Sequence, residues 1–339
     1  MDGGRKDLRG KGRLKLTAGT LRTLGPAIAA LLALAAPAVA LDYPNRPITL
    51  VVAHGPGGPS DVIARILGRL LTPVLKQPII VENRPGAAGA IAGEYAANAT
   101  PDGYTLLMGN TGILAANPRR LKESGFDPQL DFAPITLIGT QANALVVNPA
   151  LPAQTAMQLM ELARARPGLI TYASSGHGSA SHLASELFRA EARANLVHVP
   201  YKKPGLALQD VVGGHVQMMF APGALVASHV RHGRLRALGL ATRTRSGLLP
   251  GVATLDELGL QGFDATTWYG LAAPAGTPKE IVDVLYHLVG AALEDPTARR
   301  IMAGFGIDVV GSSPKAFEQY IAKQVSKWSP VIKAIAYTH

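Results

Sequence analysis

Two turns rich in glycine and serine stand where helices are expected to begin. One turn spans residues 54–61 and follows the apolar run 48–53, and the other spans residues 174–179 and follows the run 170–173. A turn between a strand and a helix exposes backbone N–H groups, and the positive end of the helix dipole adds to their attraction for anions. Two such turns, about 120 residues apart, predict a clamp of two lobes around a small carboxylate.

The first turn lacks the Lys-Ser/Thr ending of a nucleotide P-loop, so nucleotide binding is not expected. The alternative for Ser60 or Asp61 is that either residue simply caps the following helix and binds no ligand. Five of its eight residues are Gly or Pro, and glycine permits the close approach of a ligand to the backbone. The turn as a whole therefore points to binding more strongly than either polar residue does.

The serines of the second turn raise an alternative, nucleophilic catalysis. Ser174 or Ser175 would need a base, such as His177 or His182, and a group that orients the base. No serine stands in the G-x-S-x-G elbow of hydrolases. A serine hydrolase therefore remains the lesser alternative, and we predict no catalytic residue.

The histidines do not form a recognisable metal motif. His177 and His182 are five residues apart, which does not place them on one helix face, and His229 and His232 have no evident third ligand. There is no H-E-x-x-H pattern and no cysteine, so zinc–thiolate sites, disulfides and thiol nucleophiles are excluded. We expect neither a metal nor a cofactor.

The first 40 residues have the pattern of a signal peptide. A basic segment leads into an apolar run over about residues 24–36, and residues 38–40 (AVA) fit a small-x-small cleavage site. The run is shorter than a membrane span of roughly 20 residues, and no later stretch reaches that length without charges. We expect export to the periplasm and no membrane span after cleavage.

Much of the chain's excess of basic over acidic residues lies in this segment. Removing it leaves 299 residues and takes away seven Lys/Arg and two Asp, so the net charge falls from +10 to +5. No basic run is interleaved with aromatic residues, as nucleic-acid binding would require. We therefore expect no nucleic-acid partner, and an anionic small ligand agrees with the remaining charge.

The elements that must position the two turns alternate between strand and helix. This alternation is typical of α/β proteins with parallel sheets and helices on both faces. The helices expected from apolar spacing cover residues 61–75, 155–166, 278–292 and 314–336. The expected strands cover residues 48–53, 79–82, 105–108, 145–147, 171–173, 197–199, 217–220 and 235–241.

Two extended segments, Phe132–Val147 and Asp264–Ala273, are predicted to cross between lobes. Lobe one would then comprise residues 42–140 and 267–339, and lobe two residues 141–266. A double crossing is the hinge of a closing clamp.

Seven motifs occur in an order that resembles the Bug family, the extracytoplasmic solute-binding proteins of tripartite tricarboxylate transporters. The resemblance extends from about Tyr43 to the C-terminus. The motifs are residues 56–61 (PGGPSD), 81–87 (VENRPGA), 101–107 (PDGYTLL), 172–176 (YASSG), 198–202 (HVPYK), 213–214 (GG) and 274–278 (PAGTP).

The resemblance implies a type II periplasmic-binding-protein fold, with two α/β lobes joined by two crossing strands around a ligand cleft. It implies a monomer that captures a small carboxylate, such as a di- or tricarboxylate or an aromatic acid, and delivers it to a membrane permease. A sensor that presents its ligand to a membrane kinase would use the same cleft. The family's carboxylate-binding loops correspond here to Gly57, Gly58, Ser60 and Asp61, and to Ser174, Ser175, Gly178 and Ser179, with Thr111 and Tyr201 as further candidates.

Three departures from the family pattern add potential cations to the cleft. His54 replaces a large aromatic residue, His177 replaces Asn, and Lys203 replaces Gly, while Ala221 stands where Asp is frequent. We hypothesise a ligand with at least two anionic groups, the distal one near His54, His177 or Lys203. The alternative is that these departures are neutral surface substitutions without a function.

Overall fold

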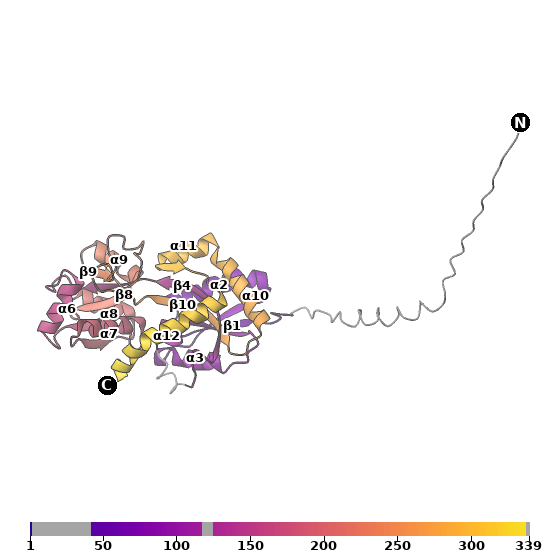
Figure 1. Ribbon diagram of the computed structural model, residues 1–339, viewed down its shortest axis with the longest axis horizontal. Coiled ribbons are helices and arrows are strands. Elements are labelled where there is room, and N and C mark those ends of the chain that lie inside the picture. The colour runs from indigo at the N-terminus through magenta and orange to yellow at the C-terminus, as the bar shows by residue number, and fades with distance from the viewer. Residues whose placement is uncertain (2–41, 117–124, 337–339) are drawn as a thin grey trace. The chain divides into compact units, whose positions relative to one another are not determined.

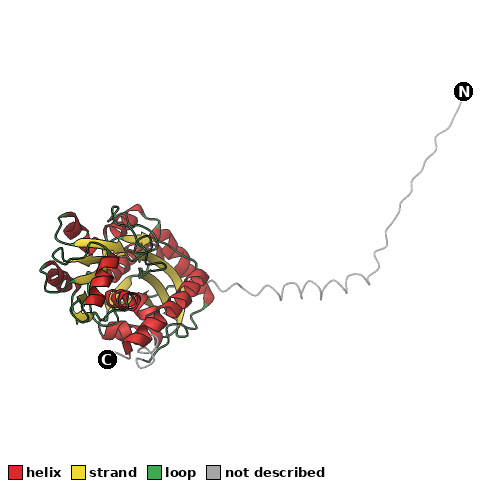
Figure 2. Ribbon diagram, turned by 60° about the vertical axis from the view of Figure 1, so that its left-hand side comes forward, coloured by secondary structure: helices red, strands yellow, loops and turns green. Residues whose placement is uncertain are grey.

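The computed structural model describes Met1 and residues 42–116 and 125–336. The predicted signal peptide lies almost entirely outside these residues. From Pro44 onward the chain contains two β-sheets with helices packed around them (Figures 1 and 2). This is the predicted α/β architecture with two lobes.

The first sheet has six strands in the order β11-β4-β10-β3-β1-β2. Strand β1 pairs in parallel with β2 and β3, whereas β10 is antiparallel to both β3 and β4. The bounds are β1 Ile48–Val52, β2 Ile79–Asn83, β3 Thr105–Asn110, β4 Phe132–Gln141, β10 Thr267–Pro274 and β11 Ile307–Val309.

The second sheet has five strands in the order β7-β6-β8-β5-β9. Strand β6 is parallel to β7 and β8, and β5 is antiparallel to β8 and β9. The bounds are β5 Asn143–Val147, β6 Thr171–Ser174, β7 Val197–Pro200, β8 Met218–Pro222 and β9 Arg236–Leu240.

The expectation of parallel sheets holds for part of each sheet only, because both sheets are mixed. The antiparallel members include the segments that pass between the sheets. Strand β4 belongs to the first sheet and continues after Ala142 as β5 of the second. The crossing strands β4, β5 and β10 pair antiparallel with their neighbours, and the parallel pairs come from the strands joined through helices.

The helices cover both sheets, and their starts follow local signals. Thr155 caps α6 by accepting a hydrogen bond from the Gln158 N–H at 3.1 Å, as expected for a helix N-cap. The bounds are α2 Pro59–Leu75, α3 Ala90–Ala97, α4 Thr111–Leu114, α6 Ala156–Ala165, α7 Ala180–Ala192, α8 Pro204–Val212, α9 Gly223–Arg231, α10 Lys279–Leu293, α11 Pro296–Gly304 and α12 Pro314–Ala336, with a 3-10 turn at Ala87–Gly89.

Strand β5 shows how the core is shared between the two faces of a sheet. Leu145 and Val147 enter the large apolar cluster that also holds Trp268 and Phe317, whereas Ala144 and Val146 enter a second cluster on the opposite face. This alternation is the period of two expected of a strand that is buried on both sides. Helix α12 packs against β4 of the first sheet and against α7, a helix that contacts β8 of the second sheet.

Within the described ranges, no helix combines the length and the apolar character needed to cross a bilayer.

Candidate ligand-binding groove

The first predicted loop is held in shape by the buried carboxylate of Asp61. Its Oδ2 accepts hydrogen bonds from the Gly57 N–H at 3.0 Å and from Nε of Arg65 at 2.9 Å. Its Oδ1 accepts one from Nδ2 of Asn83 at 2.9 Å, and the same Nδ2 lies 2.8 Å from the His54 carbonyl oxygen. Burial by itself raises the pKa of Asp61, but the hydrogen bonds from Arg65, Gly57 and Asn83 outweigh it and hold this pKa below its usual value.

Helix α2 begins at this loop without a side-chain cap, so the expectation that Ser60 or Asp61 caps it was wrong. Its N-cap is Gly58, in extended conformation, and Pro59 follows at the first helical position. The first N–H groups of a helix have no acceptor within the helix, and Gly58 has no side chain to offer one. Gly57, with a φ of 88°, takes a left-handed conformation that favours glycine. The loop therefore presents backbone donors at the positive end of a 17-residue helix.

A second segment of the first sheet lies beside this loop. Asn110, at the end of β3, caps α4 by accepting from the N–H groups of Gly112 and Ile113. Its Nδ2 lies 3.5 Å from Nδ1 of His54. The His54 side chain keeps contact with solvent, yet the surrounding protein lowers the pKa of its imidazole by desolvation. At neutral pH this imidazole is therefore a neutral polar group.

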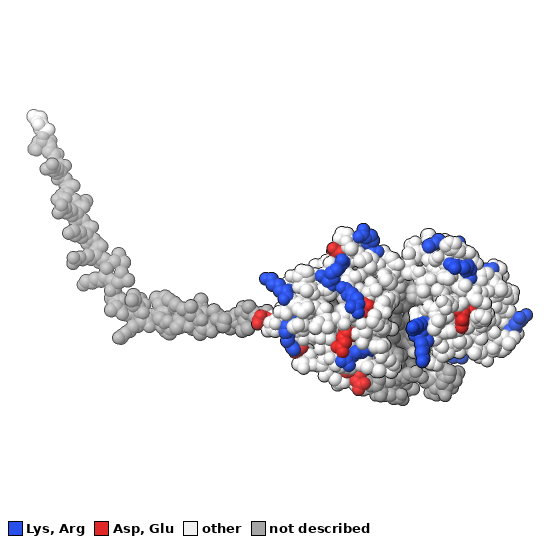
Figure 3. Space-filling model, turned by 180° about the vertical axis from the view of Figure 1, so that it is seen from behind, with Lys and Arg blue, Asp and Glu red and all other residues white. Residues whose placement is uncertain are grey.

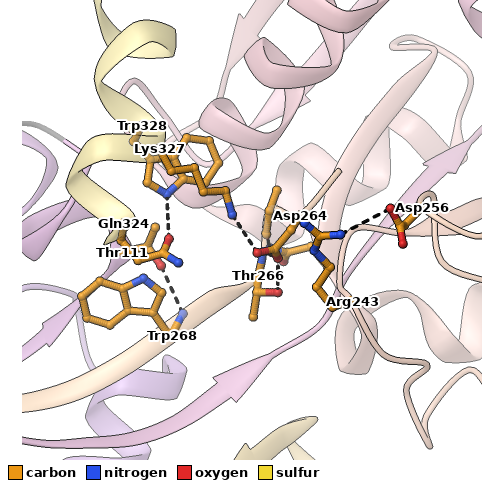
Figure 4. Close-up of polar contacts among 11 residues, drawn as sticks. Thr111, Arg243, Asp256, Asp264, Thr266, Trp268, Gln324, Lys327 and Trp328 are labelled. Atoms are coloured by element: carbon orange, nitrogen blue, oxygen red, sulfur yellow. Dashed lines mark hydrogen bonds and ion pairs between the residues drawn. The ribbon is translucent and has the colours of Figure 1, made fainter. Parts of the chain in front are cut away.

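Thr111 faces the interior. Its Oγ1 accepts a hydrogen bond from the Trp268 N–H at 3.1 Å, and both residues are buried (Figure 4). The contact ties the loop after β3 to the crossing strand β10.

The serines of the second loop are largely engaged with one another and with the backbone. Ser174 is fully buried, and its Oγ accepts from the Gly176 N–H at 3.1 Å. The Ser175 N–H donates to Oγ of Ser181 at 3.0 Å. Ser179 donates to the Gly176 carbonyl oxygen at 2.7 Å and caps α7. These hydroxyls build the loop, and Ser175 remains exposed.

The two loop regions approach each other closely. A Cβ added to Gly112 would lie 3.4 Å from the carbonyl oxygen of Gly178, so the turn after β3 faces the turn after β6 almost in contact. The space-filling view shows a groove between the two halves of the molecule, with basic side chains at its rim (Figure 3). The predicted residues of both loops thus belong to parts of the chain that face one another.

Tyr201 and Lys203 follow β7, next to the second loop. The Tyr201 N–H donates to the Ser174 carbonyl oxygen at 3.0 Å, but its hydroxyl donates to Asp210 of α8 at 2.5 Å. Burial and this hydrogen bond raise the pKa of Tyr201 to about 12. Lys203 is exposed at the start of α8.

The crossing segments are fastened by buried polar contacts. Asn143 donates to the Ala265 carbonyl oxygen and to the Thr267 hydroxyl, both at 2.9 Å. Lys327 of α12 pairs with Asp264 at 2.8 Å (Figure 4). Burial acts to raise the pKa of Asp264, but the charge and hydrogen bond of Lys327 outweigh it, so this pKa is lowered.

Residues 63–337 match the family described as the tripartite tricarboxylate transporter family receptor. The chain belongs to this family. This confirms the resemblance to Bug proteins and makes the chain a member of a family of periplasmic solute-binding receptors.

Three relatives show how far the likeness extends. BugT of Bordetella pertussis is 35% identical over 301 residues, covering 88% of this chain and 92% of BugT. The structure of Rpa4515 from Rhodopseudomonas palustris with adipate has a TM-score of 0.76 at 32% identity, covering 86% of this chain and 98% of that one. The structure of MatC from the same species with bound malate has a TM-score of 0.76 at 30% identity, covering 86% of this chain and 100% of MatC.

The receptor also brings together three histidines that sequence reasoning did not group. His177 of the second loop, His182 of α7 and His198 of β7 have ring nitrogens within 4.8 Å of one another. Strand β7 pairs with β6 so that His198 stands opposite Tyr172. Because consecutive parallel strands of a βαβ unit are usually neighbours, this adjacency was the signal available in the sequence.

Proposed function

We propose that this receptor captures a small carboxylate in the periplasm and delivers it to the permease of a tripartite tricarboxylate transporter. The observation that carries the proposal is the close approach of the segment after β3, at Gly112, to the second glycine-rich loop, at Gly178. The first glycine-rich loop lies beside that segment, where His54 approaches Asn110. The relatives solved with adipate and with malate support a dicarboxylate as the first ligand to test, and a tricarboxylate or an aromatic acid follows. Export by a signal peptide over residues 1–40 and a monomeric state belong to the same proposal.

The loops would bind a carboxylate mainly through backbone N–H groups and hydroxyls. Such donors replace the water around an anion without requiring a fixed counter-charge. Closure of the lobes would remove the remaining water and strengthen each of these hydrogen bonds. The ligand would stabilise the closed form only by binding that form more tightly than the open one.

We assign different tasks to the predicted site residues. Gly57, Gly58 and Ser60 would bind from lobe one, and Ser175, Gly178 and Ser179 from lobe two. Asp61, Ser174 and Thr111 would act through the loops that their hydrogen bonds hold in shape. Lys203 and His177, with the backbone of Tyr201 beside them, would receive a second anionic group of the ligand. His54 would contribute only a neutral ring N–H, because its lowered pKa removes the positive charge that the sequence suggested.

The lobe boundaries are part of the proposal. Lobe one would comprise residues 42–140 and 267–339, and lobe two residues 141–266. The membership of the strands supports this division, since those of the first sheet end at Gln141 and resume at Thr267.

A serine hydrolase has one observation in its favour, because Oγ of Ser174 lies 2.6 Å from Nε2 of His198. Ser174 is fully buried, however, and its Oγ already accepts from the Gly176 N–H. A nucleophile must reach its substrate, so we propose binding without chemistry on the ligand. Assays with p-nitrophenyl esters test this directly: hydrolysis that Ser174→Ala abolishes would contradict it.

The test of the proposed function is a thermal-shift screen of the purified protein in EDTA. The panel contains citrate, succinate, malate, adipate, glutamate, nicotinate and terephthalate, and the uncharged amide of each acid serves as its control. We expect stabilisation by one class of acids and none by its amides, because a ligand selective for the folded state raises stability by mass action. If no acid stabilises the protein, even after unfolding and refolding to remove retained ligand, the proposal is wrong.

A further inference from the structure

We propose that His177, His182 and His198 form a binding site for a divalent transition-metal cation of the Zn²⁺ or Ni²⁺ class. The three imidazoles come from a loop, a helix and a strand, and their ring nitrogens lie within 4.8 Å of one another. Imidazole is a preferred ligand of Zn²⁺, Cu²⁺ and Ni²⁺. Three protein ligands with an open fourth position are the usual arrangement of a zinc site that also binds an exogenous group.

The cluster is close enough to contract around a metal ion. Ligands at about 2.05 Å from a tetrahedral Zn²⁺ lie roughly 3.3 Å apart, so the nitrogens must approach by at most about 1.5 Å. His177 can supply this movement, because its side chain is exposed and its neighbours Gly176 and Gly178 both take positive φ values. The exposed side chain of His177 thus supplies its part of the movement, and the stacked rings of His182 and His198 must turn as well for their nitrogens to face one ion.

The other two rings are held from behind by a packed network. The His198 ring stacks on Tyr172 with centroids 4.9 Å apart and on His182 with centroids 4.2 Å apart. The Tyr172 hydroxyl donates to Glu186, whose carboxylate pairs with Arg189. Supporting contacts of this kind orient the ligands of metal sites.

The chemistry of the cluster leaves room for an anion. The described group consists of imidazoles alone, so a bound divalent cation would keep its full charge. The loop that carries His177 includes Gly178, whose carbonyl oxygen lies close to Gly112 of the segment after β3. A carboxylate oxygen of the captured ligand is therefore the natural occupant of the open coordination position.

Metal binding is coupled to the proposed carboxylate loop through one hydrogen bond. The Gly178 N–H donates to Nδ1 of His182 at 3.1 Å. Coordination through Nδ1 would occupy the lone pair that accepts this bond, and coordination through Nε2 would move the ring proton onto Nδ1. Either mode releases the Gly178 N–H, which then becomes available to an anion in the groove.

The test is a titration of the full protein, without a polyhistidine tag and stripped of metal by EDTA, with Zn²⁺ in competition with a chromophoric indicator. We expect one equivalent of Zn²⁺ per chain, and at least a roughly tenfold loss of affinity in His177→Asn and in His198→Gln. His232→Asn is the matched control, because His232 is an exposed histidine whose Nδ1 lies 2.7 Å from the Ser228 carbonyl oxygen. In NMR spectra, Zn²⁺ should also accelerate amide exchange at Gly178.

Absence of stoichiometric Zn²⁺ binding would overturn the proposal, and so would an affinity that His177→Asn leaves unchanged. Since His177 is exposed, that variant should fold normally, and circular dichroism checks this. The proposed metal site and the proposed carboxylate capture are refuted by different results. Stabilisation by acids in EDTA without any Zn²⁺ binding removes only the metal site, whereas Zn²⁺ binding without any effect of acids, either in EDTA or with Zn²⁺ bound, removes only the carboxylate proposal.

Discussion

Replacing Asp61 by Asn should disorder the first loop, although the two side chains have nearly the same shape. Oδ2 accepts from the Gly57 N–H and from Nε of Arg65, and Oδ1 accepts from Nδ2 of Asn83. An amide has one oxygen and one NH₂ group, so in either orientation its NH₂ must face one of these donors. The substitution therefore creates a contact between two donors at a site where Asp61 is only 2% exposed.

The cost can be estimated from these contacts. A buried polar group left without a partner costs about 1–3 kcal/mol, whereas the pair with Arg65, whose side chain is 54% exposed, contributes at most about 1 kcal/mol. We expect Asp61→Asn to lower the free energy of unfolding by about 1–3 kcal/mol. If the ligand must restore the loop on binding, its affinity falls by about 5- to 150-fold, since each 1.4 kcal/mol is a factor of ten.

Urea unfolding, calorimetry with the acid found in the screen and amide exchange at Gly57 together measure these effects. Asp256→Asn is the matched control, because Asp256 also accepts from a glycine N–H and pairs with an arginine, but its side chain is 34% exposed. Unchanged stability and affinity in Asp61→Asn would refute the reasoning. Lost affinity with wild-type stability and wild-type exchange at Gly57 would instead assign Asp61 to direct contact with the ligand.

Three further substitutions test the groove, the hinge and the core. Gly112→Ala places a methyl group 3.3 Å from Oδ1 of Asn110 and 3.4 Å from the facing Gly178 carbonyl oxygen, so it should reduce the thermal shift produced by the acid. Gly247→Ala, with open space around the new methyl group, should leave that shift unchanged. The paired Asp264 has a lowered pKa, so its contribution to stability is fully present above the usual Asp pKa of about 3.9 and is lost as the pH falls through the lowered value. Between about pH 5 and pH 2, the urea midpoint should therefore fall less steeply in Asp264→Asn than in the wild type. Gly270→Ala would place a Cβ 2.1 Å from the buried phenyl ring of Phe317 and should destabilise the protein by about 1–3 kcal/mol in the same urea assay. Wild-type stability of this variant would contradict the packing of Phe317 against Gly270.

Local sequence signals were sufficient for most of the secondary structure. The expected helix over residues 278–292 is observed as α10, with Pro278 at its N-cap, and the expected strand over residues 171–173 is observed as β6. Such elements depend on side-chain period and on capping, which are properties of neighbouring residues. The antiparallel members of both sheets could not be predicted in this way, because pairing direction depends on residues distant in the sequence, as in β5 and β8.

The candidate site shows the same division between features set by neighbouring residues and features set by contacts between distant residues. The sequence by itself determined that two glycine-rich turns follow strands and precede helices, since glycine, proline and apolar period act within a few residues. Only the tertiary structure decided that Ser174 is buried within its loop and that the Asp61 carboxylate accepts a hydrogen bond from the Gly57 N–H. It also decided that His198 joins His177 and His182, because that contact requires the pairing of β6 with β7, 24 residues apart at Ser174 and His198.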